Sequence, residues 1–323
     1  MFLHSDELTE RMNKAGQIGK AFLFGIDFEM EESFFLTDPM AQQEILFDFR
    51  GRSNVPRRSY KIPSHHFEAF PEDYDTYQSR FETVMDGLKR GDSYLTNLTI
   101  RTPVATSLPL RDIFLYARTP YRLFLPGRFV CFSPECFVRM EKGKIFTFPM
   151  KGTIDARLPD AAQVILCDTK ETAEHNTIVD LMRNDLSRIA TGVKVNRFRY
   201  IEELHTHNGP ILQVSSEIEG ELPADYLQQV GTLFFELLPA GSVSGAPKAA
   251  TLALIRTAEK ERRSFYTGVA GYFDGSNLDA CVLIRYIEQK DAHHYFSSGG
   301  GITAQSDCRK EYDEALRKIY LPF

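Results

Sequence analysis

Two pairs of glutamates, each pair three residues apart, are the first residues whose types and spacing could do chemistry. Glu171 and Glu174 lie in one segment with helical periodicity, and Glu311 and Glu314 lie in another near the end of the chain. Residues three apart share one face of a helix. Two helices that each offer a carboxylate pair suit a hard divalent cation with oxygen ligands, which indicates Mg²⁺. The alternative is two solvated pairs, which are common on helix surfaces.

The helix predicted over residues 170–190 gives the first pair an inward position. Its apolar stripe consists of Ile178, Leu181, Met182, Leu186 and Ile189. Extended toward the amino end, this stripe passes through Glu174 and Glu171. Because a bare charge on a buried face is costly, carboxylates there need a partner. In the last predicted helix, 309–320, the two glutamates flank the apolar stripe instead.

Two single residues beside predicted strands could act as a nucleophile and an acid. Lys151 follows an apolar strand and precedes Gly152, and burial would lower the pKa of its amine and make it nucleophilic. Glu135 follows the strand that ends at Phe132, and a raised pKa would make it a general acid. On the sequence alone, both could equally be exposed loop residues.

An arginine and a glycine run could bind an anion. Arg285 lies in an apolar segment, VLIRYI, where it needs a partner. That partner is either a bound carboxylate, which a guanidinium holds with two hydrogen bonds, or a structural salt bridge. Gly299, Gly300 and Gly301 in SSGGGITA could turn successive backbone N–H groups toward an anion, or form a plain turn.

The elements around these residues predict an α+β fold with largely antiparallel sheets, because strands and helices occur in mixed order. Predicted strands cover 21–28, 128–132, 136–140, 144–148, 211–219, 268–273 and 280–288. Predicted helices cover 71–90, 170–190, 223–238, 246–259 and 309–320. With no repeat and no clear linker, the sequence favours one catalytic domain over residues 1–323.

Composition excludes several classes of function. The chain of 323 residues has 43% hydrophobic and 25% charged residues and a net charge of −6. No basic block favours nucleic acid, and no apolar run is long enough to cross a membrane. Five cysteines without a CxxC motif are typical of free thiols in a reducing compartment, so a cytoplasmic protein is predicted.

Eight segments, in order, resemble the chorismate-utilising enzyme family. They are GDSYLTNLT (91–99), SPECF (133–137), FPMKGT (148–153), KETAEHNTIVDLMRNDLSRI (170–189), LLPAGSVSGAPKAATLALI (237–255), RRSFYTGVAGYF (262–273), LIRYI (283–287) and SSGGGITAQSD with EYDEAL (297–316). The resemblance covers nearly the whole chain from about residue 68, and residues 1–67 match poorly. It implies an anthranilate-synthase-like α/β sandwich of two mainly antiparallel sheets, with the site between two sheet-containing halves.

The resemblance also implies roles for the residues singled out above. Glu171, Glu174, Glu311 and Glu314 would hold Mg²⁺, with Glu174 and Glu314 as direct ligands. The chorismate-binding positions would be Gly152, Thr153, Tyr266, Arg285, Gly299, Gly300 and Gly301. Lys151 and Glu135 would be catalytic.

Three positions bear on the branch of the family. Anthranilate synthases read Pro-Ile-Ala-Gly-Thr where this chain has Lys151 before Gly-Thr, and a lysine there resembles aminodeoxychorismate synthases. Leu95 stands where isochorismate and salicylate synthases place a water-activating lysine, although amino-transferring members commonly have glutamine there. Gln213 stands where anthranilate synthases carry a histidine linked to pyruvate loss.

The resemblance therefore implies amination of chorismate at C4, through addition of Lys151 at C2, on the way to para-aminobenzoate and folate. Ammonia would come from a glutamine amidotransferase on a separate chain. The alternatives are component I of anthranilate synthase and a non-catalytic chorismate-binding subunit.

Overall fold

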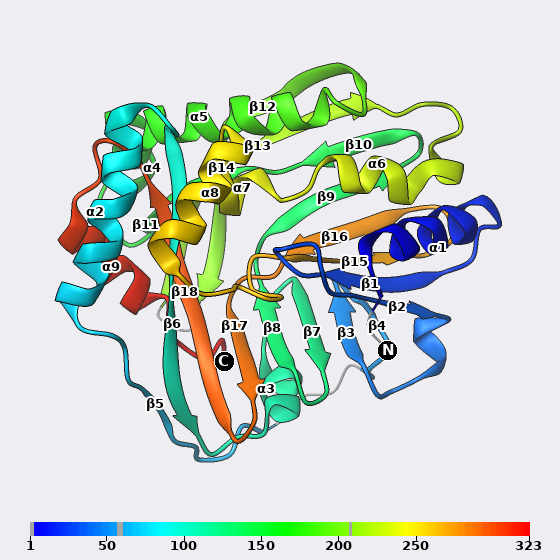
Figure 1. The fold of residues 1–323 in the computed structure, drawn as a ribbon, viewed down its shortest axis with the longest axis horizontal. Coiled ribbons are helices and arrows are strands. Elements are labelled where there is room, and N and C mark those ends of the chain that lie inside the picture. Colours follow the sequence, from blue (N-terminus) through cyan, green and yellow to red (C-terminus); the bar gives the residue numbers. More distant parts are fainter. Residues whose placement is uncertain (1–2, 57–60, 207–208) are drawn as a thin grey trace.

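The computed structural model describes residues 3–56, 61–206 and 209–323, and in these residues two nine-stranded sheets carry the fold (Figure 1). The first sheet contains, in spatial order, β11 (Met150–Asp155), β13 (Gly209–Glu221), β10 (Lys144–Thr147), β9 (Cys136–Glu141), β16 (Leu278–Val282), β15 (Val269–Phe273), β1 (Phe22–Ile26) and β2 (Ser33–Thr37), and β12 (Thr191–Thr206) pairs with β13. The second contains β14 (Gly245–Ala246), β6 (Leu95–Thr106), β18 (His293–Ile302), β17 (Tyr286–Lys290), β8 (Phe129–Ser133), β7 (Tyr121–Leu125), β3 (Leu46–Phe49) and β4 (Arg52–Ser53), and β5 (Phe67–Ala69) pairs with β6.

Every ladder between these strands is antiparallel. The predicted fold class, α+β with two mainly antiparallel sheets, is therefore confirmed. The extent of a single domain over residues 1–323 stays a prediction.

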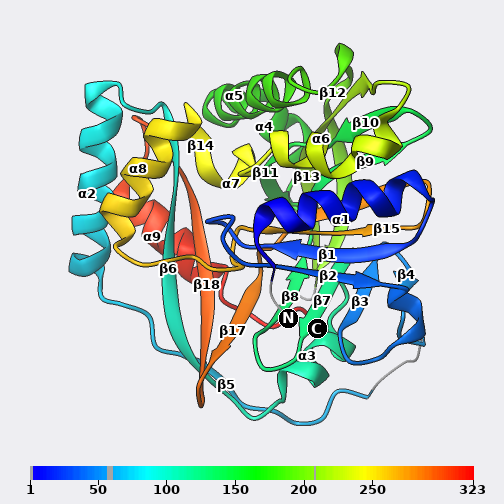
Figure 2. The same cartoon turned by 45° about the vertical axis from the view of Figure 1, so that its right-hand side comes forward.

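Helices flank the two sheets at separate places (Figures 1 and 2). They are α1 (Ser5–Gln17), α2 (Tyr74–Arg90), α3 (Leu110–Tyr116), α4 (Ala161–Cys167), α5 (Thr169–Leu186), α6 (Val230–Glu236), α7 (Gly241–Ser244), α8 (Lys248–Glu259) and α9 (Cys308–Arg317), with 3₁₀ turns at Pro39–Ala41 and Tyr226–Gln229. Helix α5 packs on β11, β12 and β13, whereas α2, α8 and α9 pack beside β6 and β18. The predicted stripe of α5 is buried as expected. None of the described helices is long and apolar enough to cross a membrane.

An aromatic core joins the sheets at the end formed by β1, β2, β3 and β7. Phe34 and Tyr272 of the first sheet pack with Phe47 and Tyr121 of the second, and the rings of Phe47 and Tyr272 lie 5.2 Å apart. Large buried rings contribute strongly to such a core. Because β11 lies at the far end of the first sheet and β6 lies next to the far end of the second, the opposite end of the sandwich is left for the predicted site residues.

The strand predicted over 280–288 is wrong in one respect, because it is two strands in different sheets. β16 ends at Val282 in the first sheet, and β17 begins at Tyr286 in the second. Arg285 lies in the break, with a left-handed backbone at φ 53°. One extended strand cannot pair in both sheets, so the chain turns where it crosses between them.

The helix predicted over 223–238 is also shorter than expected, a 3₁₀ turn followed by α6. The long strands β6, β12 and β18 and helix α1 have no counterpart among the predicted elements. Most notably, the glycine run 299–301 is not a turn but part of β18, where it pairs with residues 97–99 of β6.

Candidate active site

A cavity of about 580 Å³ brings together residues from both sheets, α5 and α9. All but two of the predicted site residues line it: Glu135, Lys151, Gly152, Thr153, Glu171, Tyr266, Arg285, Gly299, Gly300, Gly301 and Glu314. The remaining two are Glu174, the partner of Glu171, and Glu311, the partner of Glu314. Glu174 contacts Lys151.

Glu135 and Arg285 occupy two neighbouring crossings of the chain between the sheets. Glu135 lies between β8 of the second sheet and β9 of the first, as Arg285 lies between β16 and β17. The Glu135 carbonyl accepts the Val282 N–H at 3.2 Å, and the Arg285 carbonyl accepts the Phe132 N–H at 3.0 Å. These backbone bonds join the two crossings and fix an acid and a guanidinium along the same cavity.

Lys151 enters the cavity from a bulge in β11. The pairing of β11 with β13 gains one residue between Met150 and Thr153, and Gly152 has φ 89° there. A bulge of this kind redirects a side chain at the edge of a sheet. A Cβ atom at Gly152 would lie 3.0 Å from Glu171 Oε2, so a larger residue would crowd that carboxylate.

The amine of Lys151 is not neutral in this arrangement, contrary to the expectation from burial alone. Its Nζ lies 2.8 Å from Oε2 of Glu174. Burial favours the neutral amine, but the charges of Glu174, Glu314 and Glu171 outweigh it and raise the pKa of Lys151 above its ordinary value. Lys151 is therefore an ammonium that counters the glutamates around it.

Both glutamate pairs lie close to the amino ends of their helices. The Asp168 carboxylate caps α5 by accepting the Glu171 N–H at 2.9 Å, and Asp307 caps α9 by accepting the Lys310 N–H at 3.0 Å. Burial raises the pKa of Glu171 and of Glu311, and only 9% of Glu311 is exposed. Desolvated carboxylates of this kind favour a bound cation.

These carboxylates fit Mg²⁺ in ligand chemistry, although their present spacing does not form a closed site. Among the described residues, no three acidic, histidine or cysteine side chains converge as a metal-binding group. In this structure Lys151 supplies the counter-charge instead. Glu171, Glu174, Glu311 and Glu314 remain predicted Mg²⁺ ligands.

Lys318 was not predicted, yet it lines the cavity directly after the end of α9. Its Nζ is 2.7 Å from Oε1 of Glu314 and donates to the Gly299 carbonyl at 2.6 Å. Burial lowers the pKa of Lys318, whereas Lys318 itself lowers the pKa of Glu314 against the effect of burial. Glu314 and Lys318 are four residues apart in the helix predicted over 309–320, and this spacing is the sequence signal that could have found Lys318. With Arg285 and Arg317, which also line the cavity, Lys318 forms a cationic wall.

The glycine run presents alternate backbone groups to the cavity, and the predicted convergence of three successive N–H groups is wrong. The Gly299 carbonyl binds Lys318, so it faces away from β6. In an antiparallel strand the N–H and carbonyl of one residue share a side, and the sides alternate along the strand. Gly299 and Gly301 thus face the cavity, whereas Gly300 pairs toward β6. A Cβ atom at Gly300 would lie 3.5 Å from Glu311 Oε2.

Ser242 was also missed by the sequence, and it holds Glu135. Its hydroxyl, in α7, donates to Oε1 of Glu135 at 2.6 Å. Burial raises the pKa of Glu135, while Ser242, Arg285 and Lys318 oppose that rise. The net shift suits a carboxyl group that holds a proton for transfer.

The two departures noted in the sequence lie close to this cavity. Gln213 lines it, and the Gln213 amide nitrogen lies 2.9 Å from Sδ of Met150. Leu95 packs instead against the core of the first sheet. A Cβ atom at Gly301 would lie 3.1 Å from Cδ1 of Leu95.

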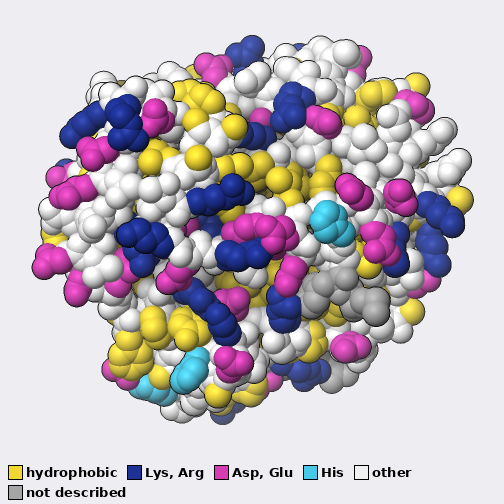
Figure 3. Space-filling view, in the orientation of Figure 1, with side chains coloured by type: hydrophobic (Ala, Val, Ile, Leu, Met, Phe, Trp, Pro, Cys, Tyr) yellow, Lys and Arg dark blue, Asp and Glu magenta, His cyan; other side chains and the backbone are white. Residues whose placement is uncertain are grey.

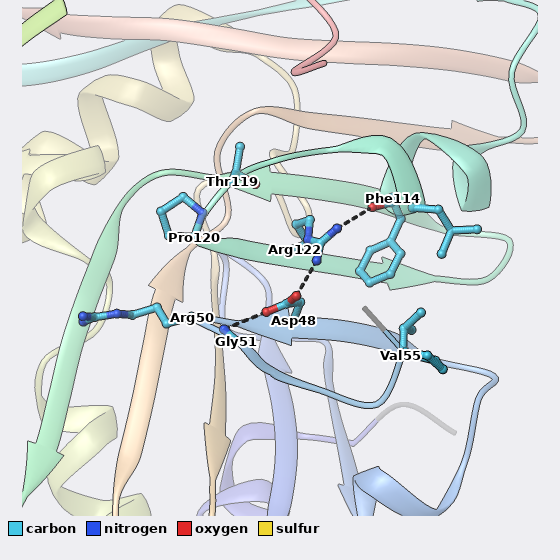
Figure 4. Close-up of a pocket in the computed structure, with 10 residues that line it drawn as sticks. Asp48, Arg50, Gly51, Val55, Phe114, Thr119, Pro120 and Arg122 are labelled. Carbon is cyan, nitrogen blue, oxygen red and sulfur yellow. Dashed lines mark hydrogen bonds and ion pairs between the residues drawn. The ribbon is translucent and has the colours of Figure 1, made fainter. Parts of the chain in front are cut away.

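A second cavity, of about 370 Å³, contains none of the predicted site residues (Figure 4). Arg122 and Asp48 form an ion pair on its wall, and Arg122 also donates to the Phe114 and Ala117 carbonyls. The Asp48 carboxylate accepts the Gly51 N–H at 2.8 Å. These polar groups bind one another, which is typical of a structural pair. Over the face seen in Figure 3, acidic and basic side chains are interspersed, with no single basic patch.

The fold and the larger cavity define an enzyme-like site, with a cationic wall, two glutamate pairs and a lysine between them. The chain belongs to the chorismate-binding enzyme family, whose model matches residues 14–322. This finding confirms the resemblance noted in the sequence.

Relatives place the chain near two branches of that family. It is 48% identical over 314 residues to an uncharacterized PabA-like protein of Haemophilus influenzae, covering 97% of this chain and 95% of that protein. It is 31% identical over 261 residues to aminodeoxychorismate synthase component 1 of Escherichia coli (76% of this chain, 56% of that protein). It is 40% identical over 200 residues to anthranilate synthase component 1 of Aquifex aeolicus (58% and 38%). The chain thus matches about half the length or less of these two synthase components.

A solved structure shows the same fold. Anthranilate synthase component I from Streptococcus pneumoniae superimposes with a TM-score of 0.70 at 23% identity, covering 93% of this chain and 80% of that one.

Proposed function

We propose that this protein aminates chorismate at C4 to give 4-amino-4-deoxychorismate. The observation that carries the proposal is the position of Lys151, which a bulge directs into a cavity that Glu135 and Arg285 also line. A lysine and a carboxylic acid beside one small ring suit addition of a nucleophile with departure of a hydroxyl group.

Charge governs how chorismate, a dianion, would bind in this cavity. Arg285 and Lys318, together with the N–H groups of Gly299 and Gly301, would hold the enolpyruvyl carboxylate. The ring carboxylate would face the glutamates, which repel it unless a cation intervenes. Mg²⁺, when bound by the glutamates, would neutralise the ring carboxylate. It would also offset the glutamate charges that keep Lys151 protonated.

The chemistry then uses two residues of the chain. Lys151, as a free amine, would add to C2 while the ring double bond shifts and the C4 hydroxyl leaves as water, with its proton supplied by Glu135. Ammonia would add at C4, the bond from C2 to Lys151 would break, and a proton released from the nitrogen nucleophiles would return to Glu135. The sum converts chorismate and ammonia into 4-amino-4-deoxychorismate and water. Covalent addition divides one difficult substitution into two easier ones.

Ammonia would come from a glutamine amidotransferase on a separate chain. The family membership and the E. coli relative, a component of aminodeoxychorismate synthase, support this partner. The product would serve para-aminobenzoate and folate synthesis in the cytoplasm.

The test is product identification with the purified chain, chorismate, MgCl₂ and ammonium at alkaline pH. We expect a product that keeps its enolpyruvyl group and carries one amino group, seen by mass spectrometry. Fluorescent anthranilate would instead establish the second candidate, which the identity to the Aquifex anthranilate synthase favours. Mg²⁺-dependent chorismate binding without any turnover would identify a non-catalytic subunit.

Glu135 gives a prediction with a pH signature. Glu135→Gln cannot donate the proton, so we expect kcat to fall by about 10²–10⁴-fold. Ser242→Ala removes a hydrogen bond that favours the charged form of Glu135, so the pKa of Glu135 should rise further. Glu135 would then keep its proton to higher pH, so the alkaline limb of the pH–rate profile should shift to higher pH.

Ser244→Ala is the matched control for the pH shift. Ser244 lies in the same short helix but donates to the Ala240 carbonyl at 2.9 Å rather than to Glu135. An equal shift of the profile in both serine variants would contradict the role given to Ser242.

A further inference from the structure

Behind the cavity lies a buried ion pair that touches none of the proposed reacting groups. Arg263 and Glu259 are 3% and 5% exposed. The Arg263 guanidinium donates twice to the carboxylate, Nε to Oε2 at 2.8 Å and Nη2 to Oε1 at 2.6 Å. A pair buried this deeply often adds no net stability compared with well-packed apolar residues. Its presence therefore calls for a role other than stabilisation.

The remaining donors of Arg263 go to the wall of the cavity. Nη1 donates to the Val243 carbonyl at 2.9 Å and to Oγ1 of Thr267 at 3.3 Å, and Nη2 donates to the Asn97 carbonyl at 2.7 Å. All three acceptor residues line the cavity. The Arg263 carbonyl also accepts the Tyr266 N–H at 3.1 Å. One rigid guanidinium thus fixes parts of β6, α7 and the segment before β15.

Glu259 makes a similar contact with β6 opposite the Gly299–Gly301 segment of β18. Its Oε1 accepts the Thr99 N–H at 2.9 Å, on the side of β6 that faces away from β18. Thr99 is the register partner of Gly299, and Asn97 is the partner of Gly301. Both anchored residues of β6 therefore lie directly opposite the two glycines that face the cavity.

We propose that Arg263 and Glu259 act as a positioning pair, which fixes the cavity wall and the Gly299–Gly301 edge in the geometry that turnover of chorismate requires. The inference rests on the proposed function only in the choice of substrate. Neither residue contacts the reacting atoms. A displacement of the wall by about 1 Å can slow a reaction by about 10²-fold.

The first test is Arg263→Lys, which keeps the charge but loses the planar fork. A single ammonium cannot reach Glu259, Val243 and Asn97 together. We expect kcat with chorismate to fall by about 10–100-fold while KM changes much less, since the wall is needed for transition-state geometry more than for binding.

Arg122→Lys is the matched control. Arg122 also pairs with a carboxylate, that of Asp48, and donates to two carbonyls, but it lies on the second cavity (Figure 4). We expect it to lower the melting temperature about as much as Arg263→Lys while kcat stays at the wild-type value. A similar loss of kcat in both variants would overturn the proposal.

A second variant tests whether the loss of kcat comes from misfolding of Arg263→Lys. Arg263→Met combined with Glu259→Leu leaves no unpaired buried charge, so it should still fold. Its melting temperature should lie below that of the wild type, because the Val243 and Asn97 carbonyls and the Thr99 N–H lose their partners. We expect it to show the same loss of kcat as Arg263→Lys. A folded double variant with wild-type kcat would also overturn the proposal.

The outcome is separable from that of the proposed function. A failed function appears as a different product, or as binding without turnover, in the wild type itself. If the wild type forms a different product, the variants are compared for the rate of that product, and an unchanged rate in both Arg263 variants would again overturn the proposal. Binding of chorismate without turnover in the wild type would overturn it as well, because the proposal concerns turnover.

Discussion

Lys151→Ala is expected to lower the rate of 4-amino-4-deoxychorismate formation by at least about 10³-fold, because it removes the proposed nucleophile. Lys318, which also lines the cavity, is held by Glu314 and the Gly299 carbonyl. Chorismate should still bind, since Arg285 and the glycine strand are untouched. Single-turnover kinetics with chorismate and ammonium, alongside calorimetric binding, measure the two effects separately. A rate close to that of the wild type would remove Lys151 from the mechanism.

Lys170→Ala is the control for charge alone. Lys170 lies on α5 with its Nζ 3.5 Å from Oε1 of Glu174, the same carboxylate that binds Lys151. Removal of this half-exposed lysine changes the charge near Glu174 but leaves the cavity amine in place. We expect nearly wild-type turnover, and an equal loss in both variants would indicate an electrostatic role for Lys151 instead of a covalent one.

The second large effect concerns Mg²⁺. Glu314→Gln keeps the size of the side chain and removes the charge of a predicted direct ligand. The Mg²⁺ concentration for half-maximal rate should rise by at least about 100-fold, because even outer residues of metal sites are worth about 10–100-fold in affinity. A Mg²⁺ titration of the initial rate measures this change.

Asp313→Asn provides the comparison on the same helix. Asp313 precedes Glu314 and pairs with Arg309 at 3.4 Å, an exposed i,i+4 contact. Such a contact contributes little, so the Mg²⁺ dependence of this variant should match that of the wild type. If Glu314→Gln also kept the wild-type dependence, Glu314 would not be a metal ligand.

The sequence predicted what local periodicity determines. The apolar stripe of α5 recurs at helical spacing, so the helix, its buried face and the inward position of Glu171 and Glu174 followed from it. The short strands β9 and β10 were recognised in the same way. Local patterns cannot report which sheet a strand joins, and the apolar run through Arg285 therefore concealed a crossing between sheets.

Long-range contacts account for the remaining differences. Gly299–Gly301 form a strand because β6, about two hundred residues earlier, pairs with them. The charge of Lys151 depends on Glu174, which belongs to another element, whereas burial was the only effect that the sequence suggested. Ser242 gave no signal, since one of two serines in a glycine-rich segment does not reveal its contact with Glu135.

No family segment was recognised in the sequence before residue 68, yet the family match begins at residue 14, and the described residues of this part have a structural role. The strands β1 and β2 extend the first sheet, and β3 and β4 extend the second. This part of the chain therefore completes both layers and supplies Phe34 and Phe47 to the core between them. Pairing with strands far along the chain, rather than a local pattern, defines these short elements.

The ion pair between Lys151 and Glu174 has a consequence for the empty enzyme in a cell. A protonated amine has no lone pair, so it forms no Schiff base with metabolic aldehydes and accepts no acyl group from activated esters. An amine kept in that form until its ligands arrive is shielded from adventitious modification. The contact with Glu174 would thus also protect the amine that we propose as the nucleophile.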